Sequence, residues 1–145
     1  MMMSEAWPQL AGKLTPEGHV VPVRVYYEDT DAGGVVYHSN YLKYCERGRT
    51  NWLRLLDIHQ SSFADMGFVV RRMLCDFLKP ARLDDLLEVE TRLVEAGGAR
   101  VEMAQRITRR GEVLFMAQVT AVLVDSQGRP KRIPKDMAAR FTPAP

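Results

Sequence analysis

Hydrophobic and polar positions follow a strand-like pattern at residues 19–28 and a helical pattern from about residue 40. Residues 19–28 are rich in valine and tyrosine, which is typical of a β-strand. From Asn40 to Leu56, apolar residues recur at spacings of three and four, and the charged side chains fall mostly on the opposite face. The pattern predicts one strand and then a long amphipathic helix, capped by Ser39 or Asn40.

Gly48 interrupts the apolar face in the middle of this predicted helix. A glycine there costs about 1 kcal/mol relative to alanine. A sheet that crosses close to the helix would explain the residue, because any side chain at this position would hold the two elements apart. We therefore expect the helix to pack against a sheet at Gly48.

Four further segments have the composition and alternation of β-strands. They are residues 68–78, 86–95, 100–108 and 113–124. The pair Gly97-Gly98 is a strong two-residue hairpin signal between two of them. The last strand is apolar on both faces from Ala117 to Val124, which is typical of a central or interface strand.

The remaining segments predict short helices and an arm. We expect a helical turn at residues 61–66 and a C-terminal helix that begins at Pro134, a residue suited to the first helical position. Residues 1–18 mix prolines and glycines with scattered apolar residues, and we interpret them as a flexible N-terminal arm. Residues 19–145 then form a single domain.

The order of these elements predicts an α+β fold. One strand, one long helix and four long antiparallel strands favour a curved five-stranded antiparallel sheet wrapped around a long central helix. A five-stranded sheet leaves an edge that must be covered or paired. Pairing with a second copy of the chain would satisfy that edge and give a homodimer.

Composition narrows the class of protein. The chain has 145 residues, of which 46% are hydrophobic and 26% charged, as in one globular domain. A net charge of +2 gives little support for nucleic-acid binding. Cys45 and Cys75 lack metal-ligand spacing, and we interpret them as buried reduced thiols. With no signal-peptide pattern and no apolar run near the ~20 residues of a membrane span, we expect a cytoplasmic protein without membrane insertion.

The candidate catalytic residues lie between the first strand and the long helix, where residues 26–41 have the sequence YYEDTDAGGVVYHSNY. A carboxylate at Asp31, beside two glycines and ahead of a helix, can act as a nucleophile or as a general base on water. The alternative is that Asp29 or Asp31 simply forms a turn or a cap. The glycines at 33 and 34 would let the backbone approach a ligand closely.

The expected start of the helix would also supply hydrogen-bond donors that can polarise a carbonyl group. The N–H groups of Val36, Tyr37 and His38 should be unpaired there, and the helix dipole favours negative charge, such as a developing oxyanion. The His38 side chain would hydrogen-bond a substrate carbonyl or tune Asp31, unless it is a structural histidine.

Two other motifs are excluded. Asp29 and Asp31 with Gly34 are similar to the opening of a calcium loop, but the fifth and twelfth positions are Gly33 and Asn40, so the ligands are missing. The glycine pair does not extend to a nucleotide phosphate loop. We predict no metal site.

The segment from Tyr26 to Tyr41 resembles the signature of the hotdog-fold acyl-CoA thioesterases. It is most similar to the tol-pal system-associated (YbgC-type) branch, related to 4-hydroxybenzoyl-CoA thioesterase. The resemblance covers about residues 20–140. It continues at residues 44–50, 68–73 and 80–85, and weakly at residues 129–134.

This resemblance implies a site, an assembly and a reaction. Asp31 would be the essential carboxylate with His38 as its partner, and backbone N–H groups at Tyr37 and His38 would polarise the thioester carbonyl. A homodimer, often a homotetramer, would bind coenzyme A across a subunit interface. The reaction needs no metal or redox cofactor, and whether Asp31 attacks directly or activates water stays open.

Basic residues are candidates for contacts with the coenzyme A phosphates, although each is also explained as a solvated surface charge. The main candidates are Arg71, Arg72, Lys79 and Arg82, and the others are Arg129, Lys131 and Arg132.

We therefore predict a thioesterase that hydrolyses short-chain acyl-CoA or acyl-carrier-protein substrates. The alternative is a non-catalytic scaffold that binds acyl-CoA or acyl carrier protein and is linked to envelope or lipid proteins. The presence of both Asp31 and His38 argues against this alternative. A hotdog dehydratase or hydratase would show a different histidine-centred motif, which is absent from the sequence.

Overall fold

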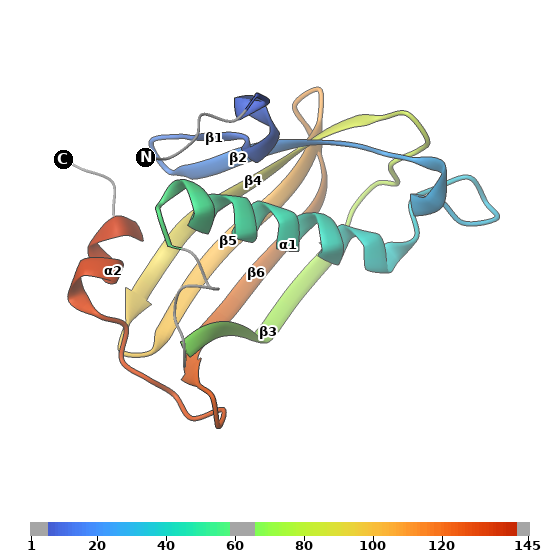
Figure 1. The fold of residues 1–145 in the computed structure, drawn as a ribbon. Coiled ribbons are helices and arrows are strands. Elements are labelled where there is room, and N and C mark those ends of the chain that lie inside the picture. The colour runs from blue at the N-terminus through green and yellow to red at the C-terminus, as the bar shows by residue number, and fades with distance from the viewer. Residues whose placement is uncertain (1–5, 59–65, 142–145) are drawn as a thin grey trace.

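The computed structural model describes residues 6–58 and 66–141, and one long helix lies across a curved antiparallel sheet (Figure 1). The helix is α1 (His38–Leu55), and the sheet has the strand order β1-β2-β4-β5-β6-β3. The strands are β1 (Lys13–Leu14), β2 (Gly18–Arg24), β3 (Met66–Phe77), β4 (Leu86–Gly97), β5 (Arg100–Arg109) and β6 (Glu112–Asp125). The short helices are the 3-10 turns η1 (Pro8–Ala11) and η2 (Tyr27–Asp29), and α2 (Lys135–Phe141). This arrangement confirms the predicted α+β class.

Among the described residues the sheet has six strands, so the predicted number of five is wrong. The additional strand is β1, which pairs antiparallel with β2 within the segment that we expected to be a flexible arm. Gly12, at φ +75°, turns the chain back, and Nε2 of the buried His19 donates to the carbonyl of Ala11 at 2.7 Å. These partners tie residues 8–18 to the sheet, unlike the arm that their prolines and glycines suggested.

The four later strands are confirmed, with ends within two residues of those predicted. The first strand ends earlier than expected, at Arg24, and residues 27–29 form η2 instead. The carboxylate of Asp29 accepts the N–H of Tyr26 at 2.8 Å, which favours this turn. The predicted helical turn at 61–66 lies outside the described residues except for Met66, where β3 begins.

Helix α1 confirms the predicted long helix but not its cap. Tyr37 occupies the position before the first turn, and no side chain caps the helix there. Asn40 is buried within the first turn, where its side-chain amide donates to the carbonyl of Asp29 at 2.8 Å. The expected capping residue therefore ties the helix start to η2.

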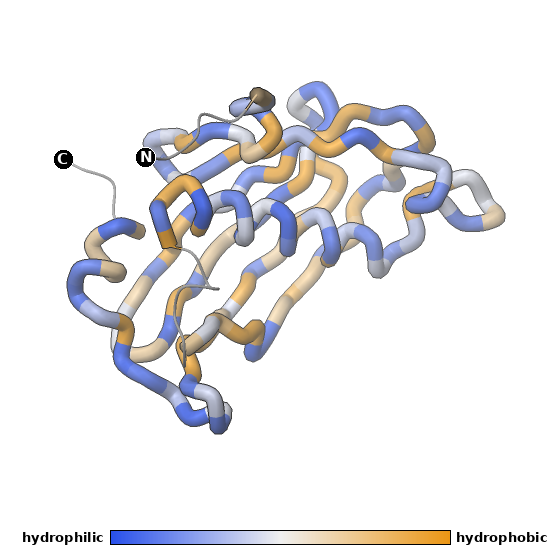
Figure 2. The backbone as a smooth tube through the Cα atoms, in the orientation of Figure 1, coloured by the Kyte–Doolittle hydropathy of each residue, from blue (hydrophilic) through white to orange (hydrophobic). Residues whose placement is uncertain are grey.

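The close approach of helix and sheet at Gly48 is confirmed. A Cβ atom there would lie 2.9 Å from Cγ1 of Val89 and 3.0 Å from the hydroxyl oxygen of Thr91, both on β4. The hydrophobic core lies between α1 and the sheet, and hydrophobic positions recur along the central strands (Figure 2). Among its largest fully buried side chains are Trp52, Tyr44 and Phe115.

Strand β3 forms one edge of the sheet. It pairs with β6 along its length, and its other side meets no strand among the described residues. Its exposed large hydrophobic residues are Val69, Val70, Leu74 and Phe77. Cys75 is half-buried, not buried as expected, because it lies on this open edge, whereas Cys45 is buried. The apolar segment 117–124 lies inside the sheet on β6, which confirms a central strand.

None of the described helices is long and apolar enough to cross a membrane.

Candidate active site

Asp31 lies near the tip of a short hairpin, residues 30–36, which we call the Asp31 hairpin. Thr30 and Val36 form its antiparallel bridge, and the N–H of Asp31 donates to the carbonyl of Val35 at 2.9 Å. Oδ1 of Asp31 accepts the N–H of Gly33 at 2.8 Å. One carboxylate oxygen therefore forms the turn, and Oδ2 has no hydrogen-bond partner in the described part of the chain. The turn-forming and the reactive interpretations of Asp31 are compatible.

The Asp31 side chain is exposed, and the residue lines a surface hollow of about 440 Å³. Most of the lining comes from the hairpin and from Tyr27 in η2. Leu83 completes it from the β3–β4 loop, residues 78–85. Leu83 falls in a segment that carried the family resemblance, but no sequence signal placed it beside Asp31.

The backbone at the helix start is more occupied than predicted. The N–H of Tyr37 donates to the carbonyl of Asp29 at 3.0 Å, and the N–H of Val36 donates to the carbonyl of Ala81 at 2.9 Å. The prediction that these two groups are free for a substrate is therefore wrong, because neighbouring segments pack against the chain as it enters α1. The N–H of His38, in the first turn of α1, has no acceptor within the helix and stays the candidate donor.

The His38 side chain is exposed at the start of α1 and packs beside two aromatic rings. Its ring centroid lies 4.4 Å from that of Tyr37 and 6.2 Å from that of Phe77 in an edge-on arrangement. Along the hairpin, Asp31 and His38 lie on opposite sides of the Thr30–Val36 bridge. No contact joins these two side chains within the described chain, so the predicted partnership stays a prediction.

A cluster of aromatic side chains packs around the start of α1. Tyr41 stacks on Phe115 with ring centroids 5.4 Å apart and an interplanar angle of 9°, and Phe77 packs edge-on against both rings. Phe77 is nevertheless 51% exposed, beside His38. Sequence reasoning missed Phe77 as a site residue because strand alternation marks it like any other apolar position.

Asp29 connects η2 to the start of α1 through its backbone carbonyl. Its carbonyl receives the N–H of Tyr37 and the side-chain amide of Asn40, which binds η2 to the first turn of α1. Burial raises the pKa of the Tyr44 hydroxyl well above its ordinary value, and the nearby Asp29 carboxylate raises it further. Tyr44 is therefore a neutral hydroxyl at any physiological pH.

The four basic candidates do not gather in one place. Arg71 and Arg72 are exposed on the edge strand β3. Lys79 and Arg82 lie in the β3–β4 loop, where Nζ of Lys79 pairs with Glu112 at 2.7 Å. The side chain of Arg82 is exposed, and its backbone bridges to Val35 of the Asp31 hairpin. Their contact with coenzyme A stays a prediction, which the position of Arg82 next to the hairpin favours.

Comparison with known proteins adds three kinds of similarity. The chain matches the model of the "Thioesterase-like superfamily" over residues 25–141. It is 44% identical over 128 residues to the acyl-CoA thioesterase YbgC of Haemophilus influenzae, a match that covers 86% of this chain and 94% of that protein.

Solved structures are similar in fold. A "Probable Thioesterase" from Bartonella henselae has a TM-score of 0.78 and 39% identity, covering 81% of this chain and 99% of that one. A thioesterase from Thermus thermophilus, crystallised with coenzyme A and Zn, has a TM-score of 0.77 and 28% identity, covering 90% of this chain and 97% of that one. Within the described residues, no group of three or more His, Cys, Asp or Glu side chains could hold a metal ion.

Proposed function

Because this chain belongs to the thioesterase-like superfamily, we propose that it hydrolyses the thioester bond of acyl-CoA at Asp31 and the start of α1. The family resemblance, the hotdog fold and the thioesterase function predicted from the sequence are confirmed, and the non-catalytic scaffold is not supported. The observation that carries the site assignment is the exposed Asp31 carboxylate, which lines a surface hollow and lies in the hairpin leading directly into α1.

The reaction needs a polarised carbonyl and a nucleophile, since a thiolate is already a good leaving group. The His38 N–H and the dipole of α1 would stabilise the negative charge that develops on the thioester oxygen. Asp31 would accept the proton of a water molecule as that water attacks the carbonyl carbon, or would attack it directly and form an anhydride. In both routes the carbon–sulfur bond breaks, and the thiolate leaves and takes up a proton. In the direct route a water molecule then hydrolyses the anhydride, which releases the free acid and restores the Asp31 carboxylate.

The acyl group would lie against apolar side chains beside these reacting groups. Phe77 presents half of its surface next to His38, and Leu83 shares the hollow with Asp31. Coenzyme A is the carrier that the similarity supports, and acyl carrier protein is a second carrier to test. Arg82, whose backbone bridges to Val35 of the hairpin, is the basic residue best placed to meet the phosphates of either carrier, and Lys79 lies in the same loop.

A homodimer formed through β3 would complete this site, and a homotetramer would build on that dimer. Strand β3 is a 12-residue edge with exposed apolar side chains, the kind of edge that invites pairing with another strand. Phe77, at its end, touches His38, so a second copy paired along β3 would lie beside the start of α1. Coenzyme A would then bind across the subunit interface.

Light scattering tests the assembly. The wild-type protein should have at least twice the chain mass of 16.5 kDa at micromolar concentration. Leu74→Lys, which places a charge on the β3 edge, should shift the protein toward the monomer, whereas Val94→Lys at an exposed position of β4 should not. A monomeric wild-type protein that still hydrolyses substrate would contradict the dimer.

Thiol release tests the function. Acyl-CoA substrates from short to long and aromatic chains, with matched acyl-carrier-protein substrates, would be mixed with the purified protein and a thiol reagent. We expect hydrolysis of at least one short-chain acyl-CoA. Absence of thiol release from every substrate would contradict the proposal. The cytoplasmic location and the tol-pal association stay predictions.

A further inference from the structure

The β3–β4 loop contacts the Asp31 hairpin through backbone hydrogen bonds. Its Ala81 carbonyl accepts the N–H of Val36 at 2.9 Å, and Arg82 forms an antiparallel bridge with Val35. Leu83 of the same loop lines the hollow that contains Asp31. The position of this loop therefore decides where the second strand of the hairpin lies.

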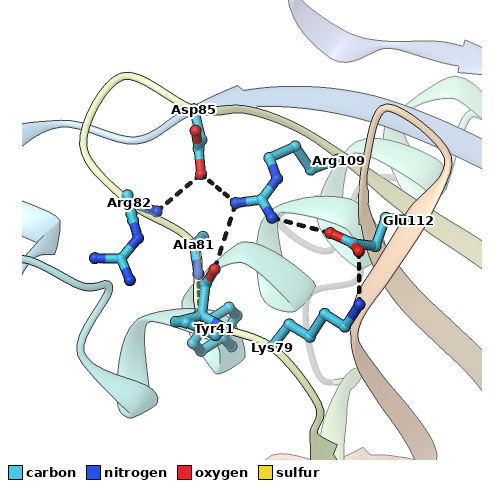
Figure 3. A network of polar contacts seen from close by, with 8 residues as sticks. Tyr41, Lys79, Ala81, Arg82, Asp85, Arg109 and Glu112 are labelled. Carbon is cyan, nitrogen blue, oxygen red and sulfur yellow. Dashed lines mark hydrogen bonds and ion pairs between the residues drawn. The ribbon is translucent and has the colours of Figure 1, made fainter.

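An ion pair holds the far side of the loop in place (Figure 3). Oδ2 of Asp85 accepts Nη1 of Arg109 at 2.8 Å and the backbone N–H of Arg82 at 2.9 Å. The other terminal nitrogen of Arg109 donates to Glu112 at 2.9 Å, so the planar guanidinium joins two carboxylates. The Arg109 and Asp85 side chains are only 28% and 24% exposed, which limits screening by solvent.

The loop is also attached to helix α1. The hydroxyl oxygen of Tyr41 accepts the N–H of Ala81 at 2.9 Å, and both residues are buried. Tyr41 lies one turn after His38, so the loop contacts the helix start and the hairpin through the same residue, Ala81. A shift of the loop would move these two parts of the proposed site relative to each other.

We propose that Arg109 and Asp85 are positioning residues, whose ion pair fixes the β3–β4 loop and thereby sets Asp31 relative to the start of α1. This inference rests on the proposed thioesterase function. Neither residue needs to touch the substrate. Burial alone would raise the pKa of Asp85, but hydrogen bonds from Arg109 and from the Arg82 backbone outweigh it and hold the pKa below its ordinary value. The pair therefore stays ionised at neutral pH.

Removal of the Arg109 guanidinium tests the proposal, with a matched control on the same strand. Arg106 also forms an ion pair from β5, with Glu90 at 3.1 Å, but no hydrogen bond or ion pair links it to the loop within the described residues. We expect Arg109→Met to lower kcat by about ten- to a hundredfold, the loss that a displacement of about 1 Å can cause. The KM should change much less, and Arg106→Met should leave kcat within about twofold.

Hydrogen exchange supplies a readout independent of turnover. The Val36 amide donates to the Ala81 carbonyl, so its exchange should be faster in Arg109→Met and unchanged in Arg106→Met. Faster exchange with unchanged kcat would overturn the positioning role. Equal losses of kcat in the two variants, or a loss of thermal stability alone in Arg109→Met, would overturn it as well.

Two further variants keep the test decisive if Arg109→Met does not fold. Arg109→Lys retains the positive charge but not the planar guanidinium that reaches two carboxylates. Asp85→Asn retains the shape of the side chain but not the ion pair. Both variants should show intermediate losses of kcat. The double variant Asp85→Asn with Arg109→Lys should lose less than the product of the two single losses, because the residues act as one pair. An inactive wild type would contradict the proposed function, whereas an active wild type with unaffected variants would contradict only the positioning role.

Discussion

The two halves of helix α1 are held in different ways. At Gly48 the helix is buried, and side-chain packing decides its position, because a single added carbon would meet Val89 and Thr91. The buried Gln105 reinforces this contact by donating to the carbonyl of Cys45 and to the Thr91 hydroxyl, each at 2.9 Å. Substitutions here should change stability first.

At its start the helix exposes His38, and hydrogen bonds from the main chain and from the Asn40 side chain to other segments hold it. Tyr37 and Val36 donate their N–H groups to η2 and to the β3–β4 loop, while the side chains of His38 and Asp31 stay accessible. The fold thus positions these two candidate catalytic residues through main-chain hydrogen bonds of neighbouring residues, which leaves the side chains accessible to a substrate. Substitutions here should change turnover first.

The strongest challenge to this comparison is Asp31→Asn. The amide keeps the shape of the side chain and still accepts the Gly33 N–H, but it removes the base or nucleophile. We expect turnover to fall by at least about a hundredfold, the low end for general-base catalysis, with an unchanged melting temperature. Asp29→Asn is the matched control, which should lose less turnover and more stability because the Asp29 charge strengthens its hydrogen bond with the N–H of Tyr26 in the first turn of η2. Near-normal turnover of Asp31→Asn would remove Asp31 from the site.

His38→Ala tests the exposed end of the helix more gently. We expect a loss of turnover of about tenfold, smaller than for Asp31→Asn, because the backbone N–H that polarises the carbonyl survives the substitution. The melting temperature should barely move, since the side chain is exposed. Melting temperature and turnover on a short-chain acyl-CoA are measured on one sample. A variant that loses stability and keeps wild-type turnover would show that His38 only packs.

Gly48→Ala tests the buried half of the helix. Overpacking costs about 1–3 kcal/mol, and the gain in helix propensity returns about 1 kcal/mol, so we expect a net loss of unfolding free energy of about 1 kcal/mol. Denaturant unfolding measures this loss, and turnover of the folded enzyme should stay the same. Gly97→Ala is the control, because a Cβ atom there would meet open space. Equal stability of the two variants would contradict the close packing at Gly48.

The smallest effect concerns the acid dependence of the Arg109–Asp85 pair. Folding lowers the pKa of Asp85. The ionised Asp85 carboxylate therefore stabilises the folded state at any pH above the pKa of Asp85 in the unfolded chain, and this stabilisation is lost as the pH falls through the pKa of Asp85 in the folded state. We expect Arg109→Met to lower the unfolding free energy by about 1 kcal/mol at pH 7, as is typical of a partly exposed ion pair. The difference from wild type should shrink below about pH 4, near the ordinary pKa of aspartate. A difference independent of pH would show that packing of the arginine stem, not the ion pair, stabilises the loop.

The long elements could be predicted from the sequence alone, which also singled out residues 26–41 as the candidate reactive segment. The periods of the apolar residues predicted α1 and the four long strands, and Gly48 predicted the close crossing by the sheet, because these features depend on neighbours within a few residues. The grouping of Asp31 with two glycines and His38 indicated the candidate site for the same local reason.

Tertiary packing sets which partners these residues meet. Phe77 beside His38, Leu83 beside Asp31 and Arg109 behind the β3–β4 loop come from segments distant in the sequence. The same holds for β1, whose pairing with β2 replaced the expected arm, and for the Tyr37 N–H, which the carbonyl of Asp29 occupies. A main-chain N–H has the same chemistry in every residue except proline, so its partner is set by the segment that packs beside it and not by the residue that carries it.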